Sequence, residues 1–298
     1  MLDFTDISID DRALFDRHLS MYNPQASELT FTNLFMWRSF YKIRYAEICG
    51  LLCIVATPDD KEPFAFVPVG EITSEAFREA VALLREYFFK KGWRLKFERV
   101  AESELPYFEE YMASGGSAVL DPDSSDYVYL TDNLVNLKGK KYDGKRNHIN
   151  KFRSRHEFEY VVLDDSHVDE CSRIVSDWCA ERDCSSHAGL YCEKIANMEL
   201  LSNYGKLGAK GALIKVDGRF EAFTAGELLN DNTAVIHIEK ANSKINGLYS
   251  FINQRFCENT WRDTTYINRE QDLGMEGLRK AKLSYHPAKL VNKYIVYI

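Results

Sequence analysis

The alternation of apolar and polar positions in the first half of the chain predicts strands that alternate with helices. The apolar runs of residues 51–56 and 63–70 flank the acidic turn TPDDKE, a combination typical of a hairpin. Residues 74–91 show helical spacing, with Ser74 as the expected N-cap, and a strand is expected at residues 95–100. Further helices are expected at residues 10–20, 28–40 and 104–112.

The second half shows the same order of elements. Asp217 and Gly218 separate two apolar runs, and this dipeptide is the strongest short signal for a hairpin. The other expected elements are helices at residues 168–182, 193–204, 248–261 and 277–283, and strands at residues 212–216, 233–239, 265–270 and 293–298. Because both halves give helices, a hairpin and then alternating helix and strand, we predict an α/β (α+β) chain built from a duplicated unit.

Positive charge is concentrated where the two halves meet. Residues 137–155, LKGKKYDGKRNHINKFRSR, carry eight Lys and Arg against one Asp, in a chain whose formal net charge is −7. We therefore place one domain at residues 1–136 and a second at residues 137–298, which begins with this basic segment. Such a concentration of charge in an acidic protein favours a site for an anion, and a solvated basic helix face is the alternative.

A helix is expected inside the basic segment, with Asp143 and Gly144 at its start. Its thin docking face consists of Lys145, Ile149, Phe152 and His156. A phosphate-bearing ligand suits the start of such a helix, because the first backbone N–H groups are unpaired there. The candidate substrate-binding residues are Lys141, Lys145, Arg146, Asn147, Asn150 and Lys151.

Composition narrows the class of protein. A length of 298 residues with 45% hydrophobic residues suits two ordinary globular domains. No apolar run approaches the roughly 18 residues of a membrane span and no signal peptide is read, so we expect a soluble, cytoplasmic protein without integral membrane association. Seven cysteines without a CxxC pair favour reduced thiols. Cys179, Cys184, His187 and Cys192 match no compact zinc spacing, so no metal is expected.

The stretch TAVIHIEKANSKINGLYSF predicts a strand, a polar loop and a helix, an arrangement that binds anions. Strict alternation puts Val235, His237 and Glu239 on one face and Ile236, Ile238 and Lys240 on the other. Gly247 allows the backbone to approach a pyrophosphate closely, although an ordinary strand-to-helix turn is the alternative. His237 is expected to be a satisfied histidine in or near the core. The candidate cofactor-binding residues are Lys240, Asn242, Lys244, Asn246, Gly247, Leu248 and Tyr249.

Polar residues 268–272, NREQD, follow a predicted strand near the end of the chain. The carboxyl ends of strands border the ligand crevice in open α/β sheets, so Glu270 or Asp272 is a candidate to orient or deprotonate an attacking amine. A structural ion-pair network is the alternative. Tyr285 is a candidate proton donor, or it packs with its OH hydrogen-bonded. Further candidate substrate contacts are Asn268, Arg269 and Arg279.

Aromatic side chains crowd residues 27–47, and we expect them in the core, with the wall of a substrate pocket as the alternative. The sequence contains no Ser/His/Asp nucleophile motif, Walker loop, GxGxxG or HExxH. This argues against hydrolases, kinases and dehydrogenases.

Three stretches resemble one family: SELTFTNLFMW, LKGKKYDGKRNHINKF and INREQDLGMEGLRKAKLSYHP. They are similar to an uncharacterised bacterial family related to the C-terminal domain of phosphatidylglycerol lysyltransferase. The resemblance implies two tandem domains of the GNAT acyltransferase fold, each a mixed, mostly antiparallel sheet flanked by helices. That superfamily includes Fem-type peptidyltransferases, which use charged tRNA, and N-acyltransferases, which use coenzyme A. The residues matching the family pattern are Lys145, Arg146, Asn147, Asn150, Lys151, Asn268, Glu270, Gln271, Asp272 and Gly274.

The resemblance implies transfer of an acyl or aminoacyl group to an amine or hydroxyl acceptor. The donor is acyl-CoA or aminoacyl-tRNA, and the sequence determines neither the donor nor the acceptor. Positioning and oxyanion stabilisation can suffice for such a reaction without a covalent nucleophile. The donor loop departs from the pattern of coenzyme A users, because Lys244 and Gly247 fill the first places and Tyr249 stands last. The alternative is a non-catalytic RNA-binding or regulatory protein on the same fold.

Overall fold

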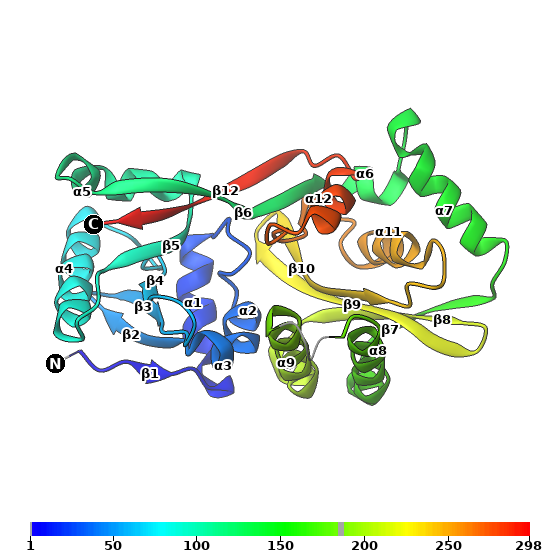
Figure 1. Cartoon of the computed structure of the whole chain (residues 1–298), viewed down its shortest axis with the longest axis horizontal. Coiled ribbons are helices and arrows are strands. Elements are labelled where there is room, and N and C mark those ends of the chain that lie inside the picture. The colour runs from blue at the N-terminus through cyan, green and yellow to red at the C-terminus, as the bar shows by residue number, and fades with distance from the viewer. Residues whose placement is uncertain (1, 184–187) are drawn as a thin grey trace. The chain divides into compact units, whose positions relative to one another are not determined.

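The computed structural model describes residues 2–183 and 188–298, and contacts divide the chain into two compact units (Figure 1). The first unit comprises Met1–Asp126, Gln271–Arg279 and Leu290–Ile298, and the second comprises Tyr127–Glu270 and Lys280–Lys289. The domain boundary between residues 136 and 137 stays a prediction, because the two units are defined by contacts in space and not by the order of residues along the chain.

The first unit contains a mixed sheet in the order β1-β2-β3-β4-β5-β12, in which only the β4–β5 pair is parallel among the described residues. The strands are β1 (Thr5–Asp6), β2 (Arg44–Ile48), β3 (Leu51–Ala56), β4 (Phe64–Ala65), β5 (Lys96–Ala101) and β12 (Lys289–Tyr297). The helices are η1 (Ile9–Asp11), α1 (Arg12–Tyr22), α2 (Phe31–Met36), α3 (Arg38–Tyr41), α4 (Ser74–Lys90), η2 (Glu102–Phe108) and α5 (Glu109–Ala113).

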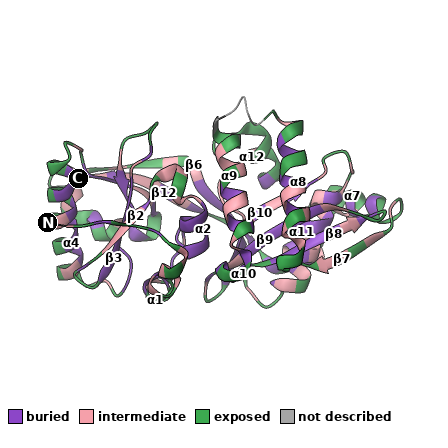
Figure 2. Ribbon diagram, turned by 90° about the horizontal axis from the view of Figure 1, so that it is seen from below, coloured by how far each residue is buried: buried purple, intermediate pink, exposed green. Residues whose placement is uncertain are grey.

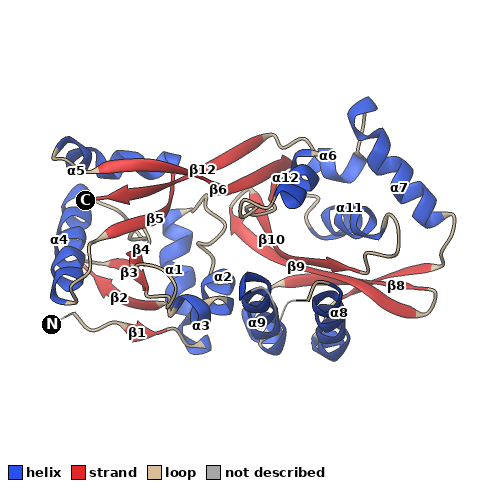
Figure 3. Ribbon diagram, in the orientation of Figure 1, coloured by secondary structure: helices blue, strands red, loops and turns tan. Residues whose placement is uncertain are grey.

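The second unit contains a sheet in the order β6-β11-β10-β9-β8-β7, in which the β10–β11 pair is parallel and the other pairs are antiparallel. The strands are β6 (Ser117–Leu130), β7 (Phe158–Val162), β8 (Lys210–Val216), β9 (Arg219–Asn230), β10 (Thr233–Ala241) and β11 (Tyr266–Asn268). The helices are α6 (Thr131–Asn136), η3 (Lys140–Tyr142), α7 (Asp143–Arg153), η4 (Asp165–His167), α8 (Val168–Glu181), α9 (Ala188–Ser202), α10 (Tyr204–Leu207), α11 (Leu248–Thr260) and α12 (Glu276–Leu283). The first parts of β6 and α12, up to Asp126 and Arg279, belong to the first unit. Helices α7 and α11 lie on one side of β8–β10, and α8 and α9 lie on the other (Figure 3).

Each unit has its own hydrophobic core, visible as buried strands and helix faces in Figure 2. Ile149 and Phe152 of α7 are buried in the core of the second unit, which confirms this part of the predicted docking face. Phe31 and Phe35 are buried in the first unit, as expected for the aromatic segment.

Several local predictions need correction. The N-cap of α4 is Thr73, whose side chain accepts a hydrogen bond from the Ala76 N–H at 3.2 Å, and Ser74 is the first helical residue. The predicted strand at 63–70 shortens to β4, and beyond it Val69 forms only an isolated antiparallel bridge with Leu52 of β3. The helix expected at 28–40 divides into α2 and α3.

One backbone feature recurs in both units. Phe97 and Asn268 are the last residues of β5 and β11 that pair with the neighbouring parallel strand. Two positions later stand Arg99 with φ 61° and Glu270 with φ 57°, a left-handed conformation that is uncommon outside glycine. The same bend after the same pairing supports the prediction of a duplicated unit.

Within the described part of the chain, no helix combines the length and apolarity that crossing a bilayer requires. The same residues contain no group of His, Cys, Asp and Glu side chains able to hold a metal ion. Cys184 and His187, two of the residues considered for zinc, lie outside the described ranges. Cys179 takes part in a disulfide, so the prediction of reduced thiols is wrong at this position.

Candidate functional site

The candidate site lies in the second unit, where the pairing of β10 and β11 ends. The two strands run parallel from Thr233 and Tyr266 to Val235 and Asn268. Strand β11 stops there, whereas β10 continues to Ala241. Polar side chains follow this point on both strands, at the carboxyl ends where α/β sheets bind ligands.

A bulge in β10 changes which side chains share a face. The register against β9 shifts between Ile236 and Ile238, so His237 is the additional residue. Ile236 packs in the core with residues of α11, whereas the Lys240 Nζ lies 3.4 Å from the centroid of the Trp178 ring of α8. The predicted common face for Ile236 and Lys240 is therefore wrong, because one additional residue reverses the alternation.

Glu239, which follows this bulge, is the centre of a polar group. The Arg269 Nη2 donates to Glu239 Oε1 at 2.9 Å, and the Asn253 Nδ2 of α11 donates to Glu239 Oε2 at 2.9 Å. Among the described residues, neither Arg269 Nη1 nor Asn253 Oδ1 has a hydrogen-bond partner, and both atoms are buried. One donor and one acceptor thus remain beside the same carboxylate, and a ligand that offers the complementary groups can satisfy both.

Aromatic rings surround the cations of this group. The Arg269 guanidinium lies 4.8 Å from the Tyr285 ring centroid, and the Lys145 Nζ lies 3.8 Å from the same centroid. The Tyr285 OH donates to Ser250 Oγ at 3.2 Å, and burial raises the pKa of this phenol. Burial, together with the nearby charge of Arg269, lowers the pKa of Lys145 to about 8.

The predicted catalytic carboxylates both have strong partners. His237 donates through Nδ1 to Glu270 and through Nε2 to Glu227, both at 2.9 Å, and its side chain is 0% exposed. Burial alone would lower its pKa, but the two carboxylates raise it to about 9. His237 is thus a satisfied, buried histidine, as the sequence analysis expected.

Asp272 belongs to the first unit and has an exposed fraction of 0%. The Arg279 Nε and Nη2 donate to it at 2.6 and 2.9 Å, and Arg279 Nη2 also donates to Asp123 at 2.7 Å. The pairs Glu270–His237 and Asp272–Arg279 therefore have the geometry of a structural ion-pair network, the alternative to a catalytic role. Asn268 is buried, and its Oδ1 accepts a hydrogen bond from the Glu270 N–H at 2.8 Å.

The loop between β10 and α11 is braced by its own side chains. Asn242 Oδ1 accepts a hydrogen bond from the Lys244 N–H at 3.0 Å, and the exposed Lys244 Nζ lies 3.1 Å from Glu181 Oε1. Gly247 has φ 93°, and a Cβ there would collide with the carbonyl oxygen of His148. The backbone of α7 thus occupies the close approach that the sequence analysis assigned to a pyrophosphate.

The remaining candidates of this loop are also held by the protein. His148 Nδ1 donates to Asn246 Oδ1 at 2.8 Å, and Leu248 is buried in the core. Lys240 forms an ion pair with Glu193, on the side of the sheet that carries α8. Tyr249 is half-buried, and burial raises the pKa of its phenol.

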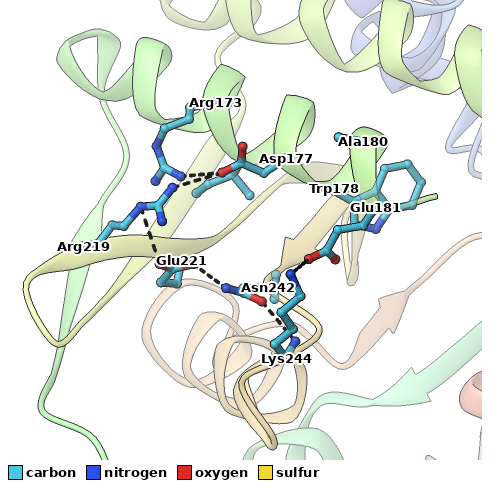
Figure 4. Close-up of a pocket in the computed structure, with 11 residues that line it drawn as sticks. Arg173, Asp177, Trp178, Ala180, Glu181, Arg219, Glu221, Asn242 and Lys244 are labelled. Carbon is cyan, nitrogen blue, oxygen red and sulfur yellow. Dashed lines mark hydrogen bonds and ion pairs between the residues drawn. The ribbon is translucent and has the colours of Figure 1, made fainter. Parts of the chain in front are cut away.

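A cavity of about 300 Å³ borders the same loop (Figure 4). It lies between α8, the start of β9 and the residues after β10. Its ion pairs include Arg173 with Asp177 at 2.8 Å and Lys244 with Glu181 at 3.1 Å. The charged lining of this cavity is thus largely neutralised by the protein.

The basic segment divides into two kinds of side chain. Arg146 donates to the carbonyl oxygens of Leu137 and Gly139 and pairs with Asp143, so it holds the entry to α7. The predicted ligand residues Lys141, Asn147, Asn150 and Lys151 are exposed. Within the described part of the chain, the exposed cations of the basic segment have no carboxylate partner; they are Lys138, Lys140, Lys141, Lys151, Arg153 and Arg155.

Glu239, Asn253 and Ser250 are not among the site residues predicted from the sequence. Asn253 interrupts the buried face of α11, which otherwise consists of apolar residues and Cys257. Glu239 likewise interrupts a strand that is mostly apolar. A polar residue at a position where the periodicity predicts an apolar one is the sequence signal that could have identified Glu239 and Asn253 as site residues.

Comparisons with known proteins identify the family and the fold of this chain. The family model described as "Phosphatidylglycerol lysyltransferase, C-terminal" matches residues 19–297. The uncharacterized protein MYCGA3080 of Mycoplasmoides gallisepticum is 23% identical over 184 residues, which are 60% of this chain and 58% of the relative. The chain thus matches little more than half the length of that relative.

Solved structures resemble the whole chain. A conserved protein of unknown function from Bacteroides thetaiotaomicron is 32% identical with a TM-score of 0.94, covering 100% of both chains. The structure of L-PGS from Bacillus licheniformis is 14% identical with a TM-score of 0.71, covering 100% of this chain and 94% of that one. A tandem GNAT protein from the clavulanic acid biosynthesis pathway is 10% identical with a TM-score of 0.54, covering 100% and 98%. The predicted fold class, two tandem GNAT-like domains, is confirmed.

Proposed function

This chain belongs to the phosphatidylglycerol lysyltransferase C-terminal family, and from that premise we propose that it transfers an aminoacyl group from a charged tRNA to an amine or hydroxyl acceptor. The observation that carries the proposal is the incompletely hydrogen-bonded group of Glu239, Arg269 and Asn253 where β10 and β11 part.

The chemistry of this group suits acyl transfer. Attack on an ester carbonyl places negative charge on the carbonyl oxygen, and a fixed, poorly solvated donor stabilises that charge best. Arg269 Nη1 is such a donor, because Glu239 and the Tyr285 ring hold its guanidinium. Asn253 Oδ1 can accept a hydrogen bond from the amino group of an aminoacyl ester, and a simple acetyl group offers no such donor.

In this proposal Glu239 and Arg269 face the reacting ester. Glu270, paired with His237, fixes the end of β11 rather than serving as the base. Tyr285 remains the candidate to protonate the leaving oxygen, with Ser250 orienting its OH. These roles require alignment of ester and acceptor but no covalent intermediate.

Two observations favour a tRNA donor over coenzyme A. Gly247, the glycine expected at a pyrophosphate, packs against the His148 carbonyl of α7. Among the described residues, the exposed cations of the basic segment have no carboxylate partner, and several such cations suit the regularly spaced phosphates of a nucleic acid. A small diphosphate would need fewer such cations.

The test is a thermal-shift titration of the full chain with bulk charged tRNA and, separately, with acetyl coenzyme A. A ligand at 100 times its Kd stabilises the folded state by about 2.7 kcal/mol. We expect a shift with charged tRNA that the variant Lys151→Glu/Arg153→Glu loses. The matched control is Lys61→Glu/Lys91→Glu, which changes two exposed lysines of the first unit and the net charge equally.

Different outcomes contradict different parts of the proposal. A shift with acetyl coenzyme A alone would replace the donor with an acyl thioester. A shift with charged tRNA that equals the shift with uncharged tRNA, and that Arg269→Gln leaves unchanged, would indicate a non-catalytic RNA-binding protein.

A further inference from the structure

Lys145 differs from the exposed cations of α7 in its surroundings. It is half-buried, and its Nζ lies 3.8 Å from the centroid of the Tyr285 ring. No carboxylate of the described residues lies within 4.0 Å of this amine, whereas Arg146, the next residue, is paired with Asp143. The positive charge of protonated Lys145 therefore has a ring face as its neighbour but no counter-ion in contact.

Its surroundings oppose protonation for two reasons. Partial burial removes water from the ammonium form, and the guanidinium of Arg269 repels it across their shared contact with the Tyr285 ring. The more distant Glu239 acts in the opposite direction but is already paired with Arg269. The result is a pKa of about 8 for Lys145.

Lys240 is the informative comparison. Burial lowers the pKa of this lysine as well, and its Nζ also lies over an aromatic ring, that of Trp178. Lys240, however, forms an ion pair with Glu193 and is buried. Lys145 therefore has an accessible amine with a low tendency to be protonated. Among the described residues, no carboxylate pairs with it.

We propose that Lys145 is a covalent modification site, acylated at Nζ by small activated acyl compounds such as acyl phosphates and thioesters. The neutral amine attacks the carbonyl carbon, a C–N bond forms, and the C–O or C–S bond to the activating group breaks. Phosphate or thiolate leaves with the bonding electron pair, and the proton of the nitrogen passes to water. The product is a neutral amide beside Arg269.

This modification goes beyond the proposed transfer and does not depend on it, because it needs neither a tRNA nor an acceptor. Its consequence for the site follows from geometry. The amide removes one positive charge from the vicinity of Arg269 and adds an acyl group over the Tyr285 ring. Acylation is therefore expected to close the site to a donor ester.

The experiment uses the wild-type full chain and acetyl phosphate as the probe. Brief, substoichiometric acetylation is carried out between pH 6.5 and 9.5, and peptide mass spectrometry measures the initial rate at each lysine. Lys151 is the internal control, because it is exposed on the same helix. Acetyl coenzyme A is tested in parallel to represent thioesters.

At pH 7.5 we expect Lys145 to be acetylated roughly tenfold faster than Lys151, because the lowered pKa of Lys145 leaves a substantial fraction of its amine unprotonated. The rate at Lys145 should level off above about pH 8. Equal rates and the same pH dependence at both residues would overturn the proposal, as would slower acetylation of Lys145 throughout. Either result leaves the proposed transfer function untouched.

Discussion

Arg269 and Glu239 form an ion pair of 2.9 Å between the end of β11 and the part of β10 that extends beyond their pairing. Their side chains are 15% and 13% exposed, so water screens the pair little. The pair thus joins two strands at the place where their backbone hydrogen bonds end.

The effects of replacing the two members of this pair should not be additive. Glu239→Gln leaves the Arg269 charge largely buried without its partner, at a cost of about 3 kcal/mol. The double variant Glu239→Gln/Arg269→Gln should cost less than the two single variants added together. Urea denaturation measures all four proteins, and strict additivity would show that the two charges do not interact.

The contribution of His237 to the free energy of unfolding should decrease as the pH rises. Its pKa is raised to about 9 in the folded state from an ordinary value near 6.5. Its contribution is therefore fully present below about pH 6.5 and is lost as the pH rises through 9, with a total of about 3 kcal/mol. The difference in unfolding free energy between wild type and His237→Gln, measured at pH 6 and at pH 9.5, should shrink. A difference that grows with pH would contradict the assigned protonation.

Gly247→Ala should destabilise the second unit. The residue has φ 93°, and a Cβ would meet the His148 carbonyl oxygen, so we expect a cost of about 2 kcal/mol or more. Gly144→Ala is the matched control, because it lies in α7 with no atom within 4 Å of its Cβ position. That variant should stabilise by about 0.5–1 kcal/mol. Thermal unfolding of both variants distinguishes strain from a general intolerance to alanine.

Lys293→Met should be strongly destabilising in the first unit. The Lys293 Nζ lies 2.6 Å from both Glu28 and Asp126, and its side chain is 0% exposed. Its removal leaves two buried carboxylates without their cation, at a cost of about 3–5 kcal/mol. Lys289→Met, an exposed residue on the same strand, should change the unfolding free energy by less than about 0.5 kcal/mol. Equal effects of the two variants would refute the role of the buried cluster.

The salt dependence of tRNA binding should show whether the exposed cations of α7 contact phosphates. Each lysine or arginine that contacts a phosphate contributes about 0.7–0.9 to the slope of log K against log salt concentration. Lys151→Glu/Arg153→Glu should therefore lower the slope by about 1.5, whereas Lys61→Glu/Lys91→Glu should leave it unchanged. Filter binding between 50 and 200 mM salt gives the slopes, and identical slopes would exclude phosphate contacts at Lys151 and Arg153.

Regular elements whose apolar residues recur with one clear period could be predicted from the amino-acid sequence. Strand β3 and helix α4 match their predicted ranges closely, and so does the placement of Ile149 and Phe152 toward a core. The basic segment and the residues of the family pattern are also evident in the sequence without the structure. In contrast, β6 has the sequence SAVLDPDSSDYVYL, whose proline and polar residues conceal a strand that neighbouring strands stabilise.

Which polar residues contact one another depends on the packing of distant segments and could not be predicted from the sequence. Glu239 lies in β10, Asn253 lies in α11 and Arg269 follows the end of β11. The bulge at His237 sets the face on which Glu239 lies. Likewise, charge composition does not distinguish Lys145 from Lys151, although packing places one over the Tyr285 ring and leaves the other in water. Local periodicity indicates whether a residue faces a core. Which residues distant in sequence it contacts depends on strand register and helix packing.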